Sequence, residues 1–173
     1  MNPASIDDIK KELKELPPKK VLDLTLRLAR FKKENKELLT YLLFESHDEA
    51  GYIRTLEADM DEMFGAVDPN PVSKAKKEYR KILRAINRQI KYIGNKSAAV
   101  ELLLYFSMKL KNQENSLHPK LQTIFLQQLT KAEKLLPLIE EDLQFDYRQK
   151  LDALRDDEII PVKKKWWKPF RPR

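Results

Sequence analysis

Residues 97–108, SAAVELLLYFSM, form the most hydrophobic stretch of this 173-residue chain and decide its fold. At about 100° per residue, these apolar side chains would point in almost every direction around a helix axis. A helix that is apolar on all sides is buried in a protein core. We therefore expect this helix at the centre, with other helices packed around it.

Towards the N-terminus, prolines divide the sequence into shorter helical blocks. Ser5 is expected to cap a helix that ends at Pro17 and Pro18. Between residues 21 and 31, leucines alternate with polar residues at the period of a half-buried strand. We favour a helix there because the chain offers no second convincing strand and because Leu, Arg and Ala are helix formers.

Amphipathic stripes continue on both sides of the central stretch. An acidic helix is expected from Gly51, then a linker at 68–71, and then a helix that Ser73 caps and Gly94 ends. His118 is expected to replace the usual N-cap residue of a further helix, and Pro137 either kinks this helix or begins another.

The whole pattern predicts an all-α protein. Only 3 glycines occur, which argues against a β protein with many tight hairpins. We expect six to eight helices in antiparallel hairpins, forming a compact bundle or a short solenoid-like stack. Residues 1–158 would form the helical domain, with a sub-division at 68–72 as an open alternative, and residues 159–173 an extended C-terminal tail.

Charge is distributed unevenly along the chain, whose formal net charge is +7. Residues 45–68 carry eight acidic residues and one basic residue, whereas residues 69–96 carry nine basic residues and one acidic residue. The last fifteen residues contain six cations and no acid, so the rest of the chain is nearly neutral. Any binding of polyanions should therefore depend on local sites rather than on net charge.

One face of the predicted 73–93 helix is strongly basic. Its residues recur at spacings of three and four, which places them in one line on a helix. We call this line the basic row: Lys74, Lys77, Lys81, Arg84, Arg88 and Lys91. Three interpretations remain open. The row faces water, it pairs with the preceding acidic block, or it binds an external polyanion such as RNA or DNA.

The C-terminal tail combines cations with both tryptophans of the chain. Its candidate binding residues are Lys163, Lys164, Lys165, Trp166, Trp167, Lys168, Phe170, Arg171 and Arg173. Exposed aromatic rings favour association, so we expect something to cover them. The alternatives are a groove of the helical body, the bases of RNA or single-stranded DNA, and an anionic membrane surface, which is the less favoured partner.

Catalytic and metal-binding signatures are missing from the sequence. The chain has no Cys, and its two histidines are 71 positions apart without a metalloprotease motif. The acidic run at 57–62 resembles a Ca²⁺ loop but has Glu62 where such loops need Gly. We expect no enzymatic activity, no cofactor, no metal and no small-molecule substrate.

The sequence thus favours a non-enzymatic helical adaptor or scaffold. It would bind another macromolecule, with a protein partner preferred, through helical surfaces and the basic aromatic tail. The alternative is an RNA- or DNA-binding protein that uses the basic row and the tail without sequence specificity. Because the first twenty residues lack a signal-peptide pattern, a cytoplasmic location is expected.

Overall fold

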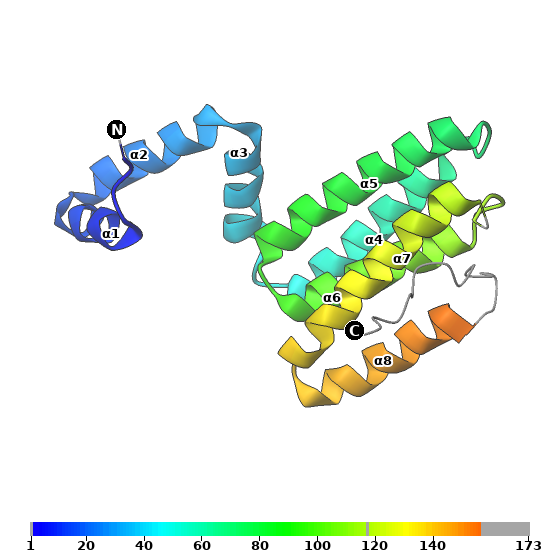
Figure 1. Ribbon diagram of the computed structural model, residues 1–173. Coiled ribbons are helices and arrows are strands. Elements are labelled where there is room, and N and C mark those ends of the chain that lie inside the picture. The colour runs from blue at the N-terminus through cyan, green and yellow to red at the C-terminus, as the bar shows by residue number, and fades with distance from the viewer. Residues whose placement is uncertain (1, 117, 157–173) are drawn as a thin grey trace, which may run out of the picture. The chain divides into compact units, whose positions relative to one another are not determined.

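The computed structural model describes residues 2–116 and 118–156 (Figure 1). Within these residues all regular secondary structure is helical, with eight α-helices and no strand, which confirms the predicted all-α class. The chain divides into two compact units, Met1–Asp48 and Glu49–Arg173, called unit 1 and unit 2 below. The predicted tail at 159–173 lies outside the described residues.

Unit 1 contains three short α-helices and a π-helical turn. These are α1 (Ile6–Glu15), α2 (Pro18–Phe31), α3 (Lys33–Thr40) and η1 (Tyr41–Glu45). The Ser5 hydroxyl accepts a hydrogen bond from the Asp8 amide at 3.2 Å, which confirms Ser5 as the cap of α1. The ambiguous stretch 21–31 is helical as predicted, since it lies within α2.

Unit 2 is built around one central helix. It comprises α4 (Glu49–Gly65), α5 (Val72–Ile93), α6 (Lys96–Lys111), α7 (Pro119–Leu135), the 3-10 turn η2 (Leu136–Leu138) and α8 (Glu141–Asp156). Helix α6 packs against α4, α5, α7 and α8 (Figure 1). Nine of its residues are buried. The prediction that the 97–108 stretch occupies the centre is therefore confirmed.

Aromatic side chains join α4, α5 and α6 in this core. The ring of Phe64 stacks on the ring of Tyr79, with 5.3 Å between their centroids, and meets Phe106 edge to face at the same distance. Offset and edge-to-face geometries align ring edges with ring faces of opposite partial charge. Three helices are thereby fixed against one another close to the α4–α5 connection.

Two predicted helix starts need correction. The residue before α5 is Pro71 and not Ser73. Proline disfavours a helical backbone at the residue before it, and Pro71 itself is extended with a ψ of 150°, so Val72 begins the helix. The central helix was expected to start at Ser97, but α6 begins at Lys96, because the side chain of the preceding Asn95 accepts a hydrogen bond from the Ser97 amide. By contrast, Gly94 ends α5 as predicted, with a φ of 73°.

The 68–72 linker joins two helices of the same unit. Helices α4 and α5 pack against each other on either side of it, and the Asn115 side chain donates to the Pro69 carbonyl at 2.7 Å. The division into compact units falls after Asp48 instead. It follows a stretch of π-helix and turn at residues 41–47.

Candidate functional site

The basic row lies on the surface of α5. Five of its six members are exposed, and Arg88 is half-buried. The opposite side of the helix is buried and carries Ala75, Tyr79, Ile82 and Ile86. The spacing predicted from the sequence thus gives one apolar face and one basic face in the structure.

Three members of the row have no carboxylate partner among the described residues. The Lys81 ammonium lies 2.8 Å from a Glu78 carboxylate oxygen one turn away on the same helix. Within the part of the chain that the structure describes, Lys74, Lys77 and Arg84 form no ion pair with a carboxylate. These three cations therefore face water.

Asp61 of α4, the acidic helix that precedes α5, pairs with residues of α6. The Asp61 carboxylate accepts hydrogen bonds from the Lys109 ammonium at 2.8 Å and from the Tyr105 hydroxyl at 2.7 Å. These two bonds, with Lys109 the stronger influence, lower the pKa of Asp61 below its ordinary value. Its partners are thus in α6 and not in the basic row.

Helix α7 adds a lysine beside the row. The Lys131 ammonium donates to the Asn87 side chain of α5. Burial, and after it the charge of Lys91, lowers the pKa of Lys131, so two cations from neighbouring helices are close enough to repel. We define the basic face as the basic row together with Lys131.

Acidic residues are rare on the two helices that form the basic face. Helices α5 and α7 together contain eleven Lys and Arg residues and two Glu residues. One of the two, Glu133, is held by the Arg155 guanidinium of α8 through two hydrogen bonds of 3.1 and 2.7 Å. This pairing turns Glu133 towards α8 and leaves the α5 side of α7 positive.

The sequence did not indicate Lys131 as part of this site. It lies 44 positions after Asn87, and no repeat or motif shows that the two residues are neighbours. A signal could come only from knowing that α5 and α7 pack side by side, which the structure shows.

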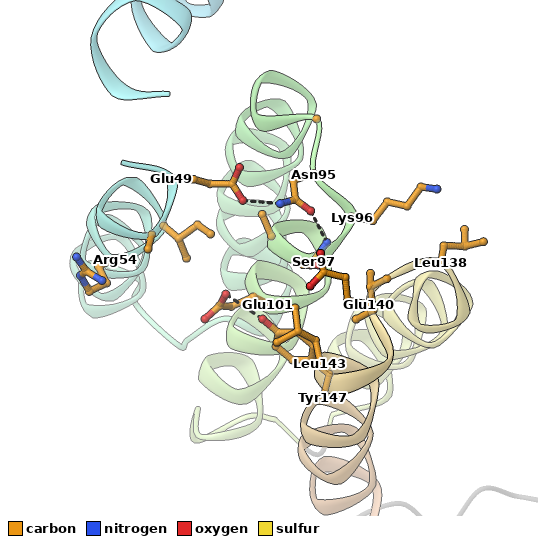
Figure 2. Close-up of a pocket in the computed structure, with 15 residues that line it drawn as sticks. Glu49, Arg54, Asn95, Lys96, Ser97, Glu101, Leu138, Glu140, Leu143 and Tyr147 are labelled. Carbon is orange, nitrogen blue, oxygen red and sulfur yellow. Dashed lines mark hydrogen bonds between the residues drawn. The ribbon is translucent and has the colours of Figure 1, made fainter. Parts of the chain in front are cut away.

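A pocket of about 880 Å³ opens where α4, α6 and α8 meet (Figure 2). The Asn95 side chain donates to the Glu49 carboxylate at 2.6 Å and accepts from the Ser97 amide. Deeper in the pocket, the Tyr147 hydroxyl donates to the Glu101 carboxylate at 3.1 Å. The polar groups of the pocket are thus hydrogen-bonded to one another. The Asn95 bond caps α6, and the bond from Tyr147 to Glu101 links α8 to α6.

A smaller cavity of about 430 Å³ contains a second carboxylate beside Glu101. Burial, and then the charge of Glu101, raises the pKa of Glu57, while Lys150 acts in the opposite direction. Burial and Glu101 also raise the pKa of Tyr147, whose ring lies 5.1 Å from the Lys150 ammonium. This cluster was not predicted from the sequence, although Glu101 is the lone acid in the most hydrophobic stretch and could have indicated it.

His118 caps helix α7. The His118 ring nitrogen Nδ1 accepts a hydrogen bond from the Lys120 amide at 3.1 Å, which confirms its predicted role as a helix cap. Among the described residues, no group of three or more His, Asp and Glu side chains could hold a metal ion. No helix in that part of the chain is both long and apolar enough to cross a membrane.

Comparison with known proteins adds no further information. Family models, curated proteins and solved structures were compared with the chain, and none of them matches it. The candidate tail residues Lys163–Lys165, Trp166, Trp167, Lys168, Phe170, Arg171 and Arg173 lie outside the described residues, so their role stays a prediction from the sequence.

Proposed function

We propose that this protein is a non-enzymatic binding protein whose basic face holds the phosphate backbone of a nucleic acid without reading its sequence. The observation that carries the proposal is the exposed row on α5, where Lys74, Lys77 and Arg84 have no carboxylate partner in the described chain. Like charges in a row raise the local potential, and the negative charge of phosphates lowers this repulsion. The counterions that the nucleic acid releases on binding add to the affinity.

The dimensions of the row suit an extended polyanion. From Lys74 to Lys91 it is about 25 Å long at about 1.5 Å per residue, which matches roughly seven base pairs along a duplex. Arg84 adds a planar guanidinium that can donate two parallel hydrogen bonds to one phosphate, whereas each lysine supplies a compact charge. Burial, and after it repulsion by Lys91, lowers the pKa of Lys131, and a phosphate between the two ammonium groups would relieve this repulsion.

Base recognition is not part of the proposal. Direct reading of a duplex requires side chains that match donor and acceptor patterns in a groove, such as paired Arg, Asn or Gln contacts with base edges. The row consists of Lys and Arg residues along the outside of a 22-residue helix, and these residue types mostly contact phosphates.

The test compares two charge-matched double variants of the full-length protein. Lys77→Glu with Arg84→Glu reverses two charges in the row, whereas Arg54→Glu with Arg148→Glu reverses two exposed arginines on α4 and α8. Binding to fluorescently labelled duplex DNA and single-stranded RNA is followed by anisotropy over a range of salt concentrations. We expect the row variant to bind at least about 10-fold more weakly and to lose about 2 from the log-log salt slope.

The matched control separates a local site from net charge. Both variants change the net charge equally, so a general attraction would weaken both to the same degree. Equal loss in the two variants, or unchanged affinity in the row variant, would show that the basic face is not the binding site.

A protein-binding adaptor is the second candidate function. The specific observation in its favour is the exposure of large apolar side chains in unit 1, from Ile6 to Phe44. Salt distinguishes the two functions, because phosphate contacts weaken steeply as salt rises while an apolar helix contact barely responds. A partner from cell lysate that stays bound after nuclease treatment and at high salt would favour the adaptor.

A further inference from the structure

Unit 1 leaves most of its large apolar side chains uncovered. Among its described residues, Tyr41 is the only buried one. Twelve others are between 36% and 79% exposed and define the N-terminal apolar surface: Ile6, Ile9, Leu13, Leu16, Leu22, Leu24, Leu26, Leu28, Phe31, Leu42, Leu43 and Phe44. Scattered exposed apolar residues are normal on a soluble protein, but this density in so short a segment is typical of an interface.

Helix α2 has the sequence of a helix inside a bundle. At about 100° per residue, its charged side chains gather in one sector of roughly 100°, and apolar or small residues fill most of the remaining circumference. Those charged residues are Lys19, Lys20, Asp23, Arg27 and Arg30. A helix that is apolar over more than half its circumference needs neighbours on several sides. Within unit 1 it packs against α3, and the Asn35 side chain of α3 donates a hydrogen bond to the Leu28 carbonyl.

Unit 2 does not offer a matching apolar surface in its described residues. It exposes only four large apolar side chains, and these lie on different elements: Met108 on α6, Leu126 on α7, Leu138 on η2 and Phe145 on α8. Four separated side chains cannot cover twelve. A partner outside this part of the chain is needed to remove the N-terminal apolar surface from water.

The size and charge of the surface fit a second copy of the same chain. Twelve side chains of this size and exposure leave roughly 1,000 Å² uncovered, against about 800 Å² per partner in a stable interface of standard size. Residues 1–48 carry ten basic and nine acidic residues, so two copies can approach without strong repulsion. The near balance also makes a strongly acidic or basic partner a poor match.

We infer that two copies of the chain associate through their N-terminal apolar surfaces and complete a helical bundle that one copy cannot form alone. A two-fold symmetric contact uses the same patch on both chains, which a surface of Leu, Ile and Phe side chains permits. The inference does not depend on the basic face, since the apolar surface and the basic row lie in different units.

The test measures the mass of the full-length protein in solution by sedimentation over a range of concentrations. The wild-type chain should sediment as a species of twice 20.5 kDa. Leu28→Lys places a charge within the apolar part of α2 and should raise the dimer dissociation constant at least about 100-fold. Asp23→Lys places the same side chain in the charged sector of the same helix and should leave the dimer intact.

Two further measurements keep the result interpretable. Circular dichroism shows whether Leu28→Lys keeps its helices, and the melting temperature shows whether the core of unit 2 is unchanged. Both tryptophans lie in the tail, so their fluorescence reports whether the tail is the occupant instead. A wild-type chain that is monomeric at every concentration would overturn the inference. A dimer that survives Leu28→Lys would also overturn it. The third contrary result is a shift of the tryptophan emission to the red in monomeric Leu28→Lys, because it would mean that the tail, and not a second copy, covers the apolar surface.

Discussion

Glu57 is the residue at which the structure predicts a clear dependence of stability on pH. Burial and the Glu101 carboxylate raise its pKa above the ordinary value of 4.5. A carboxyl group with a raised pKa holds its proton more tightly in the folded chain than in the unfolded chain. The contribution of Glu57 to stability is therefore greatest below pH 4.5 and falls as the pH rises through the raised pKa.

Glu57→Gln removes this ionisation while keeping the shape of the side chain. We expect the variant to have a higher Tm than the wild type at pH 7, and the difference to shrink to zero as the pH falls below 4.5. Glu62→Gln is the control, because Glu62 is exposed on the same helix. A higher Tm for Glu57→Gln that persists unchanged at acidic pH would mean that the gain does not come from ionisation.

At the scale of the helix, substitution by alanine should change stability in opposite directions at two glycines. Gly94 ends α5 in the left-handed region at a φ of 73°, whereas Gly65 ends α4 without a positive φ. A Cβ atom at either position would meet nothing within 4 Å, so steric crowding plays no role. The backbone conformation alone should decide the sign of each effect.

Gly94→Ala should therefore destabilise unit 2 by about 1 kcal/mol, and Gly65→Ala should stabilise it by roughly 0.5 kcal/mol. Urea unfolding followed by circular dichroism measures both values. If both variants shift the unfolding midpoint in the same direction, the left-handed cap at Gly94 is not what distinguishes the two sites.

Helices were predictable from the sequence where local patterns suffice to form them. The periodicity of apolar residues placed α4 to α8, and the absence of a partner strand decided the alternating stretch in α2 in favour of a helix. Local chemistry also identified the caps Ser5 and His118 and the stop at Gly94. The start of α5 was missed because a serine looked like the stronger cap, although Pro71 already fixes the backbone before Val72.

Contacts between helices were not predictable in this way. The pairing of Lys131 with Asn87 and that of Tyr147 with Glu101 join residues more than forty positions apart. Such neighbours follow from the packing of whole helices around α6, which no local pattern encodes. The exposure of the N-terminal leucines was equally hidden, because the spacing of residues along the chain does not show whether another helix covers them.

At the scale of the whole molecule, the distribution of charge matters more than its sum. The net charge is +7, and six of the cations belong to the last fifteen residues. A chain that ends at Glu158 would be almost neutral, yet it would keep the complete basic face on α5 and α7. Net charge and local potential therefore make different predictions for the same truncated protein.

We expect the chain that ends at Glu158 to lose most of its retention on heparin but to keep measurable binding to duplex DNA at low salt. The remaining binding should arise from the basic face, so adding Lys77→Glu and Arg84→Glu to the truncated chain should remove it. Circular dichroism should show the same helical signal in all three proteins, because the described helices end at Asp156. If the truncated chain is retained on heparin as strongly as the full-length protein, the tail is not a binding site. If truncation alone abolishes binding at low salt, the basic face does not bind polyanions by itself.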